Sequence, residues 1–421
     1  MRKLALLPPS QAVAEFNAVL DAAWRPLPAE IVPVVEARGR VLACDVIAPI
    51  SMPEFRRSSV DGYAVCAASV PGVLCVVGEV QMGRLSPFAI HLGEAALVHT
   101  GAHVPEGADA VVMLEDTQPV ADASQTEGEG ARRILVAGRV SVGDNIIQQG
   151  EDVRAGDTVL RAGTRLREQE IGGCLALGIT HVEVYRRPRV AFIASGNELV
   201  PPEHVTLPGQ VRNINVPMLA ALAARHGAEP LDFGILPDQP EAFEQAARRA
   251  LQEADAVVFI AGSSVGPRDF VAQVVERLGR PGVIAHGILF RPGKPTLFAV
   301  CDGKPVFGLP GNPISALVTA NLFLVPTLWR LQRVSHPPRP HVVRAVLASE
   351  MRSPRNLEHW FPVTLDYRAE SSHPSPLPLA IPIVTKSNLI FGLARAHGLA
   401  CAPIGVDVLP AATELDVRLM E

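Results

Sequence analysis

The first 24 residues carry an amphipathic helical pattern. Apolar side chains recur at spacings of three and four residues from Val13 to Trp24, which predicts a helix over residues 10–24. Ser10 stands at the start of this helix, where a hydroxyl can accept a hydrogen bond from a free backbone amide, so we expect Ser10 to be the N-cap. Two strand-like runs follow, at 31–35 and 41–47.

Residues 51–149 show a different pattern, in which short apolar runs stand between glycine and proline turns. The runs cover residues 74–77, 95–99, 110–114 and 134–136. Runs of this length between such turns are typical of strands, so we interpret the region as an all-β module. We expect the acidic, glycine-rich segment 121–130 to be an exposed loop.

From about residue 188, apolar runs alternate with helical stretches. Strands are predicted at 190–193, 233–236, 256–261 and 306–309, and helices at 217–226, 240–253, 269–278 and 313–331. This alternation predicts a mostly parallel sheet with helices on both faces. Because ligands of such sheets bind at the carboxyl ends of the strands, the glycine-rich turns at those ends are candidate binding loops.

The last part of the chain returns to strand patterns. A proline-rich linker at 334–341 precedes apolar runs at 342–347, 360–365, 379–384 and 415–419, which predict a small C-terminal β-barrel. The predicted fold class is therefore multidomain α/β plus β. Its parts are a mixed N-terminal domain (1–50 and 150–187), an inserted β module (51–149), a central α/β domain (188–333) and the barrel (334–421).

Composition narrows the classes of protein that fit this pattern. Hydrophobic residues make up 48% of the chain, which excludes disorder over its whole length. The net charge of −5 and the 5% of aromatic residues argue against a nucleic-acid-binding protein. The six cysteines form no C-x-x-C pair, so we expect reduced thiols in a cytoplasmic protein. The N-terminal apolar run is too short for a signal peptide, and no apolar run approaches about 20 residues, so no membrane helix is predicted.

Two loops of the α/β region have residues suited to an anionic ligand. In P-G-N-P, Gly311 lets a ligand approach the backbone, while Asn312 and Pro313 suit the start of a helix whose free amides favour an oxyanion. The alternative is a tight turn without a ligand. In R-P-G-K-P, Arg291 and Lys294 are fixed cations that suit a tetrahedral oxyanion, unless they form an ordinary basic surface loop.

Acidic residues follow two of the predicted strands. In S-G-N-E at 195–198, Glu198 is expected at the strand ends, where a carboxylate beside an anion needs a cation between them, by default Mg²⁺. The alternative is a surface acid near a turn. Asp269 follows the similar loop A-G-S-S-V-G at 261–266, where it either belongs to the site or only complements a helix dipole.

Local patterns in and near the β module are less informative. D-G at 61–62 and G-E-D at 150–152 read as turns. His99 and His103 have the spacing of a metal pair on a helix, but the surrounding glycine and proline argue against a helix, so no metal is expected there. No Ser-His-Asp or Cys-His set stands out.

Taken in order, the motifs resemble one family. They are S-x-x-D-G-Y-A-V, T-G-A-x-V-P-E-G-A-D-A-V-V, G-E-D, S-G-x-E-L, P-G-K-P and G-L-P-G-N-P-x-S-A. This set is similar to molybdopterin molybdenumtransferase, the MoeA family, which includes the E-domain of gephyrin. The resemblance runs from about residue 10 to 420 and is strongest at 58–65, 100–115 and 291–317.

The resemblance implies a transferase of molybdenum cofactor biosynthesis. Members of the family insert molybdate into adenylylated molybdopterin, use Mg²⁺ and release AMP. They are elongated homodimers whose active site lies between the α/β domain of one subunit and the β module of the other. Candidate partners are the molybdopterin adenylyltransferase that makes the substrate and recipient molybdoenzymes, with neither nucleic acid nor membrane involved.

The resemblance also carries roles to individual residues. The implied catalytic set is Asp61, Thr100, Asp152, Glu198, Asp238, Asp269, Arg291 and Lys294. The pterin and its phosphates are expected over Ser195, Gly196, Gly262, Ser263, Ser264, Gly293, Pro310, Gly311, Asn312, Pro313 and Ser387. Glu198 and Asp238 are the implied Mg²⁺ ligands, and Arg291 and Lys294 would hold molybdate or the adjacent phosphate. Residues 61, 100 and 152 would come from the partner subunit.

Several positions depart from the usual pattern of the family. Asn197 stands where aspartate is common, Arg291 where lysine is common and Ala261 where glycine is common. In the C-terminal domain, K-S-N at 386–388 stands where Gly-Ser-Gly is usual. These departures leave two alternatives open: a variant paralogue that uses tungstate, and a non-catalytic protein that binds the cofactor or serves as a scaffold.

Overall fold

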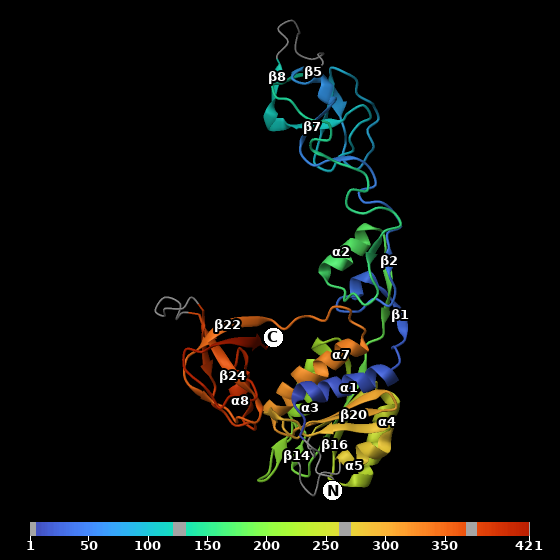
Figure 1. The fold of residues 1–421 in the computed structure, drawn as a ribbon. Helices are drawn as coiled ribbons and strands as arrows, with labels where there is room; N and C mark the ends of the chain where they lie inside the picture. The colour runs from blue at the N-terminus through green and yellow to red at the C-terminus, as the bar shows by residue number, and fades with distance from the viewer. Residues whose placement is uncertain (1–5, 121–131, 261–270, 368–376, 421) are drawn as a thin grey trace.

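Four packed bodies follow one another along an extended molecule (Figure 1). The computed structural model describes residues 6–120, 132–260, 271–367 and 377–420. The β module forms one end of the molecule, a narrower body follows it, and the α/β domain forms the other end with the C-terminal barrel at its side. The predicted loop at 121–130 lies outside the described residues.

The β module is a six-stranded sheet with a buried cluster on each face. Its strand order is β7-β4-β6-β5-β9-β8. The strands are β4 (Gly62–Val65), β5 (Gly72–Glu79), β6 (Glu94–Val98), β7 (Ala110–Met113), β8 (Thr117–Val120) and β9 (Arg133–Val136). Neighbouring residues of a strand point to opposite faces, so Ala64 joins one cluster and Val65 the other. A short pair, β3 (Arg57–Ser58) with β10 (Ile146–Ile147), closes the module toward the next body.

The intermediate body consists of two short antiparallel pairs and one helix. Strand β1 (Ala29–Pro33) pairs with β12 (His181–Tyr185), and β2 (Val46–Ile47) pairs with β11 (Thr158–Leu160). The 3-10 turn η1 (Val34–Glu36) and helix α2 (Glu168–Ala176) cover them. The strand predicted at 31–35 therefore ends early, and that predicted at 41–47 shrinks to two residues, because Val41 and Leu42 make only isolated bridges.

The α/β domain has a mixed six-stranded sheet in the order β16-β13-β17-β21-β20-β18. The first four strands run parallel: β16 (Glu229–Leu236), β13 (Arg189–Ser195), β17 (Ala256–Ile260) and β21 (Lys304–Leu309). The other two are antiparallel and were not predicted: β20 (Leu297–Cys301) and β18 (Pro281–His286). Both are short, and their apolar runs carry no clear periodicity.

Helices cover both faces of this sheet, as the alternating pattern predicted. On one face lie α1 (Pro9–Ala23), α3 (Asn215–Arg225), α6 (Pro313–Thr319), the π-turn η4 (Ala320–Leu324) and α7 (Val325–Leu331). On the other face lie α4 (Pro240–Glu253) and α5 (Val271–Leu278). By length and composition, the span Pro313–Leu331 is the one helix of the described chain that could cross a membrane, and 72% of its apolar window is buried in the protein.

The expected cap of the first helix is wrong. Helix α1 begins at Pro9, with Pro8 in the N-cap position and no side-chain capping bond. Ser10 lies exposed within the first turn. Proline has a fixed φ that matches the first helical turn and lacks the amide that a cap would satisfy, so the helix starts one residue earlier than the serine indicates.

The C-terminal body is a closed five-stranded barrel. Its strands are β22 (Val342–Leu347), β24 (Glu358–Asp366), β25 (Leu379–Pro382), β26 (Gly398–Ala402) and β28 (Glu414–Leu419). The additional pairing of β24 with β26 closes the sheet. Strand β26 was not predicted, since its sequence G-L-A-C-A has no polar alternation. The short strand β19 (Phe290–Arg291) from the α/β domain pairs with β24 and so joins the two bodies.

Candidate functional site

The carboxyl ends of the four parallel strands place the predicted loops in a row. Because the strand order is β16-β13-β17-β21, the last residues of these strands, Leu236, Ser195, Ile260 and Leu309, lie side by side along one edge of the sheet. Four predicted residues, Gly262, Ser263, Ser264 and Asp269, together with Ala261, lie outside the described residues.

Two carboxylates lie at the end of this row. The exposed Glu198 folds back over Gly196, where an added Cβ would lie 2.9 Å from both carboxylate oxygens. The backbone amide of Asp238, from the neighbouring loop, donates to Asn197 Oδ1 at 3.3 Å. The two loops are therefore linked, and their carboxylates share one edge of the sheet. Ser195 Oγ is buried and has no hydrogen-bond partner among the described residues.

The P-G-N-P turn lies at the other end of the row, against the barrel. Asn312 occupies the N-cap position of α6, and Pro313 the first helical position, as expected. The Asn312 side chain makes no capping bond, and its Nδ2 donates to Ser387 Oγ at 3.0 Å. The backbone amide of Ile314 donates to the carbonyl of Ser387 at 3.1 Å. The predicted Ser387 is therefore fixed against the helix start by two hydrogen bonds.

The R-P-G-K-P loop is packed against the same helix. An added Cβ at Gly293, whose φ is +126°, would lie 2.3 Å from Thr319 Cγ2. The Thr296 hydroxyl donates to the Gly293 carbonyl at 2.6 Å and fixes the turn. Arg291 and Lys294, on either side of this turn, are both exposed. The turn is thus rigid, while its two cations remain free to meet a ligand.

A cavity of about 750 Å³ lies between the α/β domain and the barrel. Its walls include the predicted residues Arg291, Gly293, Lys294, Pro310, Asn312 and Ser387. The barrel adds residues that sequence reasoning did not assign: Glu350, Arg352, His359, Trp360 and Lys386. Four cations and one carboxylate line this cavity, so its charge suits an oxyanion. Apart from Lys386, no local motif marks these barrel residues, which the β19–β24 pairing and the Ser387 contacts bring to the cavity.

His359 is a neutral group in the wall of this cavity. Burial, and to a smaller extent the nearby Arg291 charge, lower the pKa of His359 to about 4. Its Nδ1 atom is buried without a hydrogen-bond partner among the described residues. At neutral pH, His359 therefore adds no positive charge, and the cavity's cationic character comes from its arginine and lysine side chains.

A second cluster of predicted residues lies in the β module. Asp61 Oδ1 accepts hydrogen bonds from the Thr100 backbone amide at 2.8 Å and from the Thr100 hydroxyl at 3.3 Å. His99 Nδ1 lies 3.5 Å from the same oxygen. These contacts, with the backbone bond the largest, lower the pKa of the exposed Asp61 carboxyl and keep it ionised.

The structure does not bring all predicted residues together within one chain. The cluster of Asp61 and Thr100 lies in the β module, at the far end of the molecule from the α/β domain (Figure 1). Asp152 lies in the intermediate body, where it lines a small cavity of about 210 Å³ beside α2. Among the residues that the structure describes, no group of three or more His, Cys, Asp or Glu side chains has the arrangement of a metal site.

Family models match two parts of the chain. One, described as the MoeA N-terminal region (domain I and II), covers residues 8–178, and the other, a probable molybdopterin binding domain, covers residues 191–330. A molybdopterin molybdenumtransferase of Nostoc sp. is 33% identical over 89% of this chain and 85% of its own length. Molybdopterin molybdenumtransferase 2 of Mycobacterium tuberculosis is 32% identical over 97% of this chain and 99% of its own.

Solved structures agree with these matches over the whole chain. Two structures of the molybdopterin biosynthesis MoeA protein of Pyrococcus horikoshii each cover 99% of this chain and 100% of their own. One is 32% identical with a TM-score of 0.77, and the other is 28% identical with a TM-score of 0.81. The overall architecture described above is therefore shared with them.

Proposed function

The chain belongs to the MoeA family of molybdopterin molybdenumtransferases, and from this premise we propose that it inserts molybdate into adenylylated molybdopterin and releases AMP. It is thus a transferase of molybdenum cofactor biosynthesis. The observation that carries the finer proposal is the cationic cavity between the α/β domain and the barrel. The substrate provides the dithiolene sulfurs that take the metal, so the reaction needs no protein cysteine.

The charges of the cavity support binding of molybdate or the neighbouring phosphate. Arg291 offers a forked set of donors and Lys294 a point charge, from a loop that Gly293 and Thr319 hold in place. The barrel contributes Arg352 and Lys386 from the opposite wall. Donors held in position before the reaction stabilise charge that develops during cleavage of the phosphoanhydride, without the cost of reorganising water.

The donor set at the edge of the sheet fits Mg²⁺. The ion is commonly held by one or two carboxylates together with substrate phosphates and water, so a full protein cage is not required. Glu198 and Asp238, whose loops are linked through Asn197, are the residues that would hold it. When bound, Mg²⁺ would neutralise part of the negative charge of the substrate's phosphoanhydride.

The positions of the predicted residues favour a site shared by two copies of the chain. Asp61 and Thr100 belong to the β module at the far end of the molecule, so their own α/β domain is out of reach in this conformation (Figure 1). We therefore propose a homodimer in which Asp61, Thr100 and Asp152 complete the partner's site. The ionised Asp61 would orient substrate groups there. We also propose a cytoplasmic enzyme that receives substrate from molybdopterin adenylyltransferase and supplies molybdoenzymes.

The deciding experiment measures AMP release from adenylylated molybdopterin by the purified protein with Mg²⁺ and a titration of molybdate. The same samples are tested for activation of a cofactor-free molybdoenzyme. We expect AMP release that requires both Mg²⁺ and molybdate, together with activation. A parallel titration with tungstate distinguishes the variant paralogue, which would prefer that ion. Tight substrate binding without AMP under either oxyanion would contradict the proposal and favour a binding protein.

A further inference from the structure

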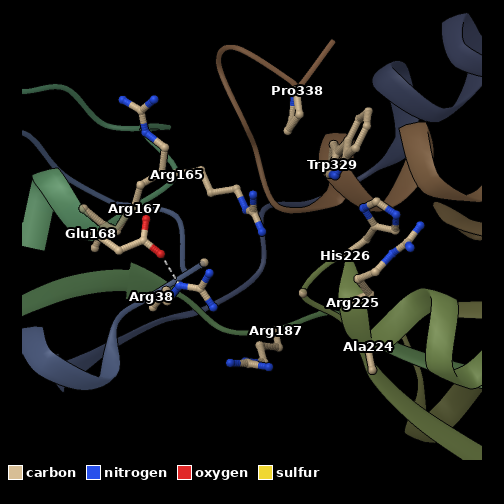
Figure 2. Close-up of a pocket in the computed structure, with 13 residues that line it drawn as sticks. Arg38, Arg165, Arg167, Glu168, Arg187, Ala224, Arg225, His226, Trp329 and Pro338 are labelled. Atoms are coloured by element: carbon tan, nitrogen blue, oxygen red, sulfur yellow. Dashed lines mark hydrogen bonds and ion pairs between the residues drawn. The ribbon is translucent and has the colours of Figure 1, made fainter. Parts of the chain in front are cut away.

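A second cationic pocket lies between the intermediate body and the α/β domain (Figure 2). Its volume is about 470 Å³, which is within the usual range for a small-molecule site. The charged side chains that line it are Arg38, Arg165, Arg167, Glu168, Arg187 and Arg225. Five arginines and one glutamate thus surround one small space in a chain whose net charge is −5.

The pocket is separate from the proposed substrate site. Arg187 stands two residues before β13 begins, and Arg225 ends α3 immediately before β16. Both positions are at the amino ends of the parallel strands, whereas the proposed substrate site is at their carboxyl ends. The sheet therefore separates the two sites, and no residue that we assign to the transferase site lines this pocket.

Three of the five arginines have no partner for their charge among the described residues. Arg38 forms an ion pair with Glu168 at 2.5 Å, drawn in Figure 2, and Arg167 forms one with Glu170 at 2.6 Å. Arg165, Arg187 and Arg225 have no hydrogen bond or ion pair from their guanidinium groups in the described chain. Like charges in one pocket repel each other, so an anion between them would relieve this repulsion.

The neighbouring His226 lies in the same positive potential. Burial and, to a smaller extent, the charges of Arg225, Arg165 and Arg418 together lower the pKa of His226 to about 4. No carboxylate opposes these effects on His226. The imidazole of His226 packs edge-on against the nearly buried Trp329, with ring centroids 5.5 Å apart. The wall beside the arginines is thus a neutral aromatic surface that suits a flat, uncharged part of a ligand.

From these observations we propose that the pocket binds a small anion that carries two or more phosphate groups. The unpaired Arg165 of the intermediate body and the unpaired Arg187 and Arg225 of the α/β domain would contact the phosphates from two sides. A single phosphate would not span a pocket of this volume, while a long acidic segment would not fit within it. Binding would therefore also tie the intermediate body, which carries the β module, to the α/β domain.

The test measures binding of inorganic pyrophosphate and of ADP by titration calorimetry, without Mg²⁺, to the full-length protein. We expect the Arg165→Gln/Arg225→Gln variant to bind each probe about tenfold more weakly or worse, since each change removes charge-assisted hydrogen bonds. Arg139→Gln, a change of an exposed arginine in the β module, is the matched control and should leave both affinities unchanged. Lys294→Gln alters only the other cationic cavity, so it can weaken binding of the probes there but should leave the binding step that the arginine variant removes unchanged.

The two probes distinguish the source of the phosphates. Equal affinities would indicate recognition of the phosphates alone, and tighter binding of ADP would indicate that the His226 and Trp329 wall contacts the base; either result supports the site. Binding that is lost with Lys294→Gln but kept in the arginine variant would overturn the proposal, as would no binding of either probe. Tighter binding of a hexaglutamate peptide than of pyrophosphate would also overturn it, since that result indicates a protein partner.

Two further measurements show whether the arginine variant loses binding only because its fold has changed. The arginine variant should unfold at the same temperature as the wild type or slightly higher in phosphate-free buffer, because it relieves repulsion. It should also retain AMP release, since the pocket lies at the opposite edge of the sheet from the substrate loops. If the double variant does not fold, Arg187→Gln, which changes an exposed side chain, provides the same comparison.

Discussion

At the scale of single residues, the two cations of the R-P-G-K-P loop carry most of the proposed chemistry. Lys294 is exposed beside a turn that Gly293 and Thr296 fix, so its ammonium group is available without being needed for folding. Removing one positioned donor for a developing oxyanion typically costs two orders of magnitude in rate. This separation of roles allows a variant to test chemistry without disturbing the fold.

We expect Lys294→Gln to lower molybdate-dependent AMP release about 100-fold while the unfolding temperature stays unchanged. The assay is AMP formation at saturating molybdate, with circular dichroism for stability. Arg139→Gln is the control, since it removes an exposed cation far from the cavity. An equal loss of activity in the control, or none in Lys294→Gln, would show that the cavity charge is not required.

The two buried histidines predict how stability depends on pH. The folded-state pKa values of His226 and His359 are both lowered to about 4 from the ordinary 6.5 of histidine, mainly by burial. Below pH 6.5 the unfolded chain therefore binds protons that the folded chain does not, so stability falls as pH falls from 6.5 toward 4. We expect each histidine to contribute about 1–2 kcal/mol to this loss.

We expect His359→Gln to reduce the loss of unfolding free energy between pH 7 and pH 4.5, because glutamine does not titrate. The measurement is urea unfolding of the wild type and the variant at both pH values. His204→Gln, which changes an exposed histidine, serves as the control and should keep the wild-type difference. Parallel losses in wild type and His359→Gln would refute the assignment.

At the scale of elements, the site depends on how loops are packed against helix α6. The R-P-G-K-P turn touches this helix at Thr319, and the barrel loop reaches its start through Ser387. At the first of these contacts, one added carbon atom would already displace the loop. Gly293 combines a φ of +126° with an added-Cβ distance of 2.3 Å to Thr319 Cγ2, so neither the backbone nor the space tolerates a side chain.

We expect Gly293→Ala to lower the unfolding free energy by about 2 kcal/mol or more and to reduce AMP release strongly, because the loop must move away from α6. Gly138→Ala is the matched control, since nothing lies within 4 Å of a Cβ at that position. The free energies come from urea unfolding at pH 7. Equal small effects of the two substitutions would show that the turn adapts without cost.

The same elements show what could be predicted from the sequence. Helix α4 and strand β22 have the predicted bounds, because each carries a clear period over enough residues. Strands β18, β20 and β26 have no such period and were missed. Asn312 occupies the predicted N-cap position, but its hydrogen bond to Ser387 was not predicted, since that contact joins residues 75 positions apart. A pattern within one segment contains no information on such a contact.

The candidate site shows the same limit. The loops at 195–198, 291–294 and 310–313 could be found because glycine, proline and charge stand together there. His359, Arg352 and Trp360 could not, since they belong to ordinary strand patterns of the barrel. They reach the cavity only because β19 leaves the α/β domain and pairs with β24, opposite Glu358 and His359. Long-range pairing, rather than local chemistry, places them there.

At the scale of the whole molecule, the extended shape separates residues that the family resemblance assigns to one site. Asp61 and Thr100 are hydrogen-bonded to each other in the β module, and Arg291 and Lys294 line the cavity at the other end (Figure 1). In a symmetric dimer, Asp61 and Thr100 of each chain would meet the Arg291 and Lys294 cavity of the other chain. The dimer would then contain two equivalent sites. Coexpression of two variants can test this arrangement. A chain altered at Asp61 and a chain altered at Lys294 would together still form one site in which both residues are intact.

We expect two inactive variants, Asp61→Asn and Lys294→Gln, to restore activity when they are expressed together. If chains pair at random, half of the dimers contain one of each variant, and each of these has one site with both defects and one site with none. The mixture should therefore release AMP at about a quarter of the wild-type rate, as symmetry of two shared sites requires. Each variant expressed alone, and a mixture of the purified variants assayed before chain exchange, should remain inactive. A coexpressed sample that also remains inactive, although calorimetry or tagged pull-down shows mixed dimers, would place both residues in the same chain's site or outside it.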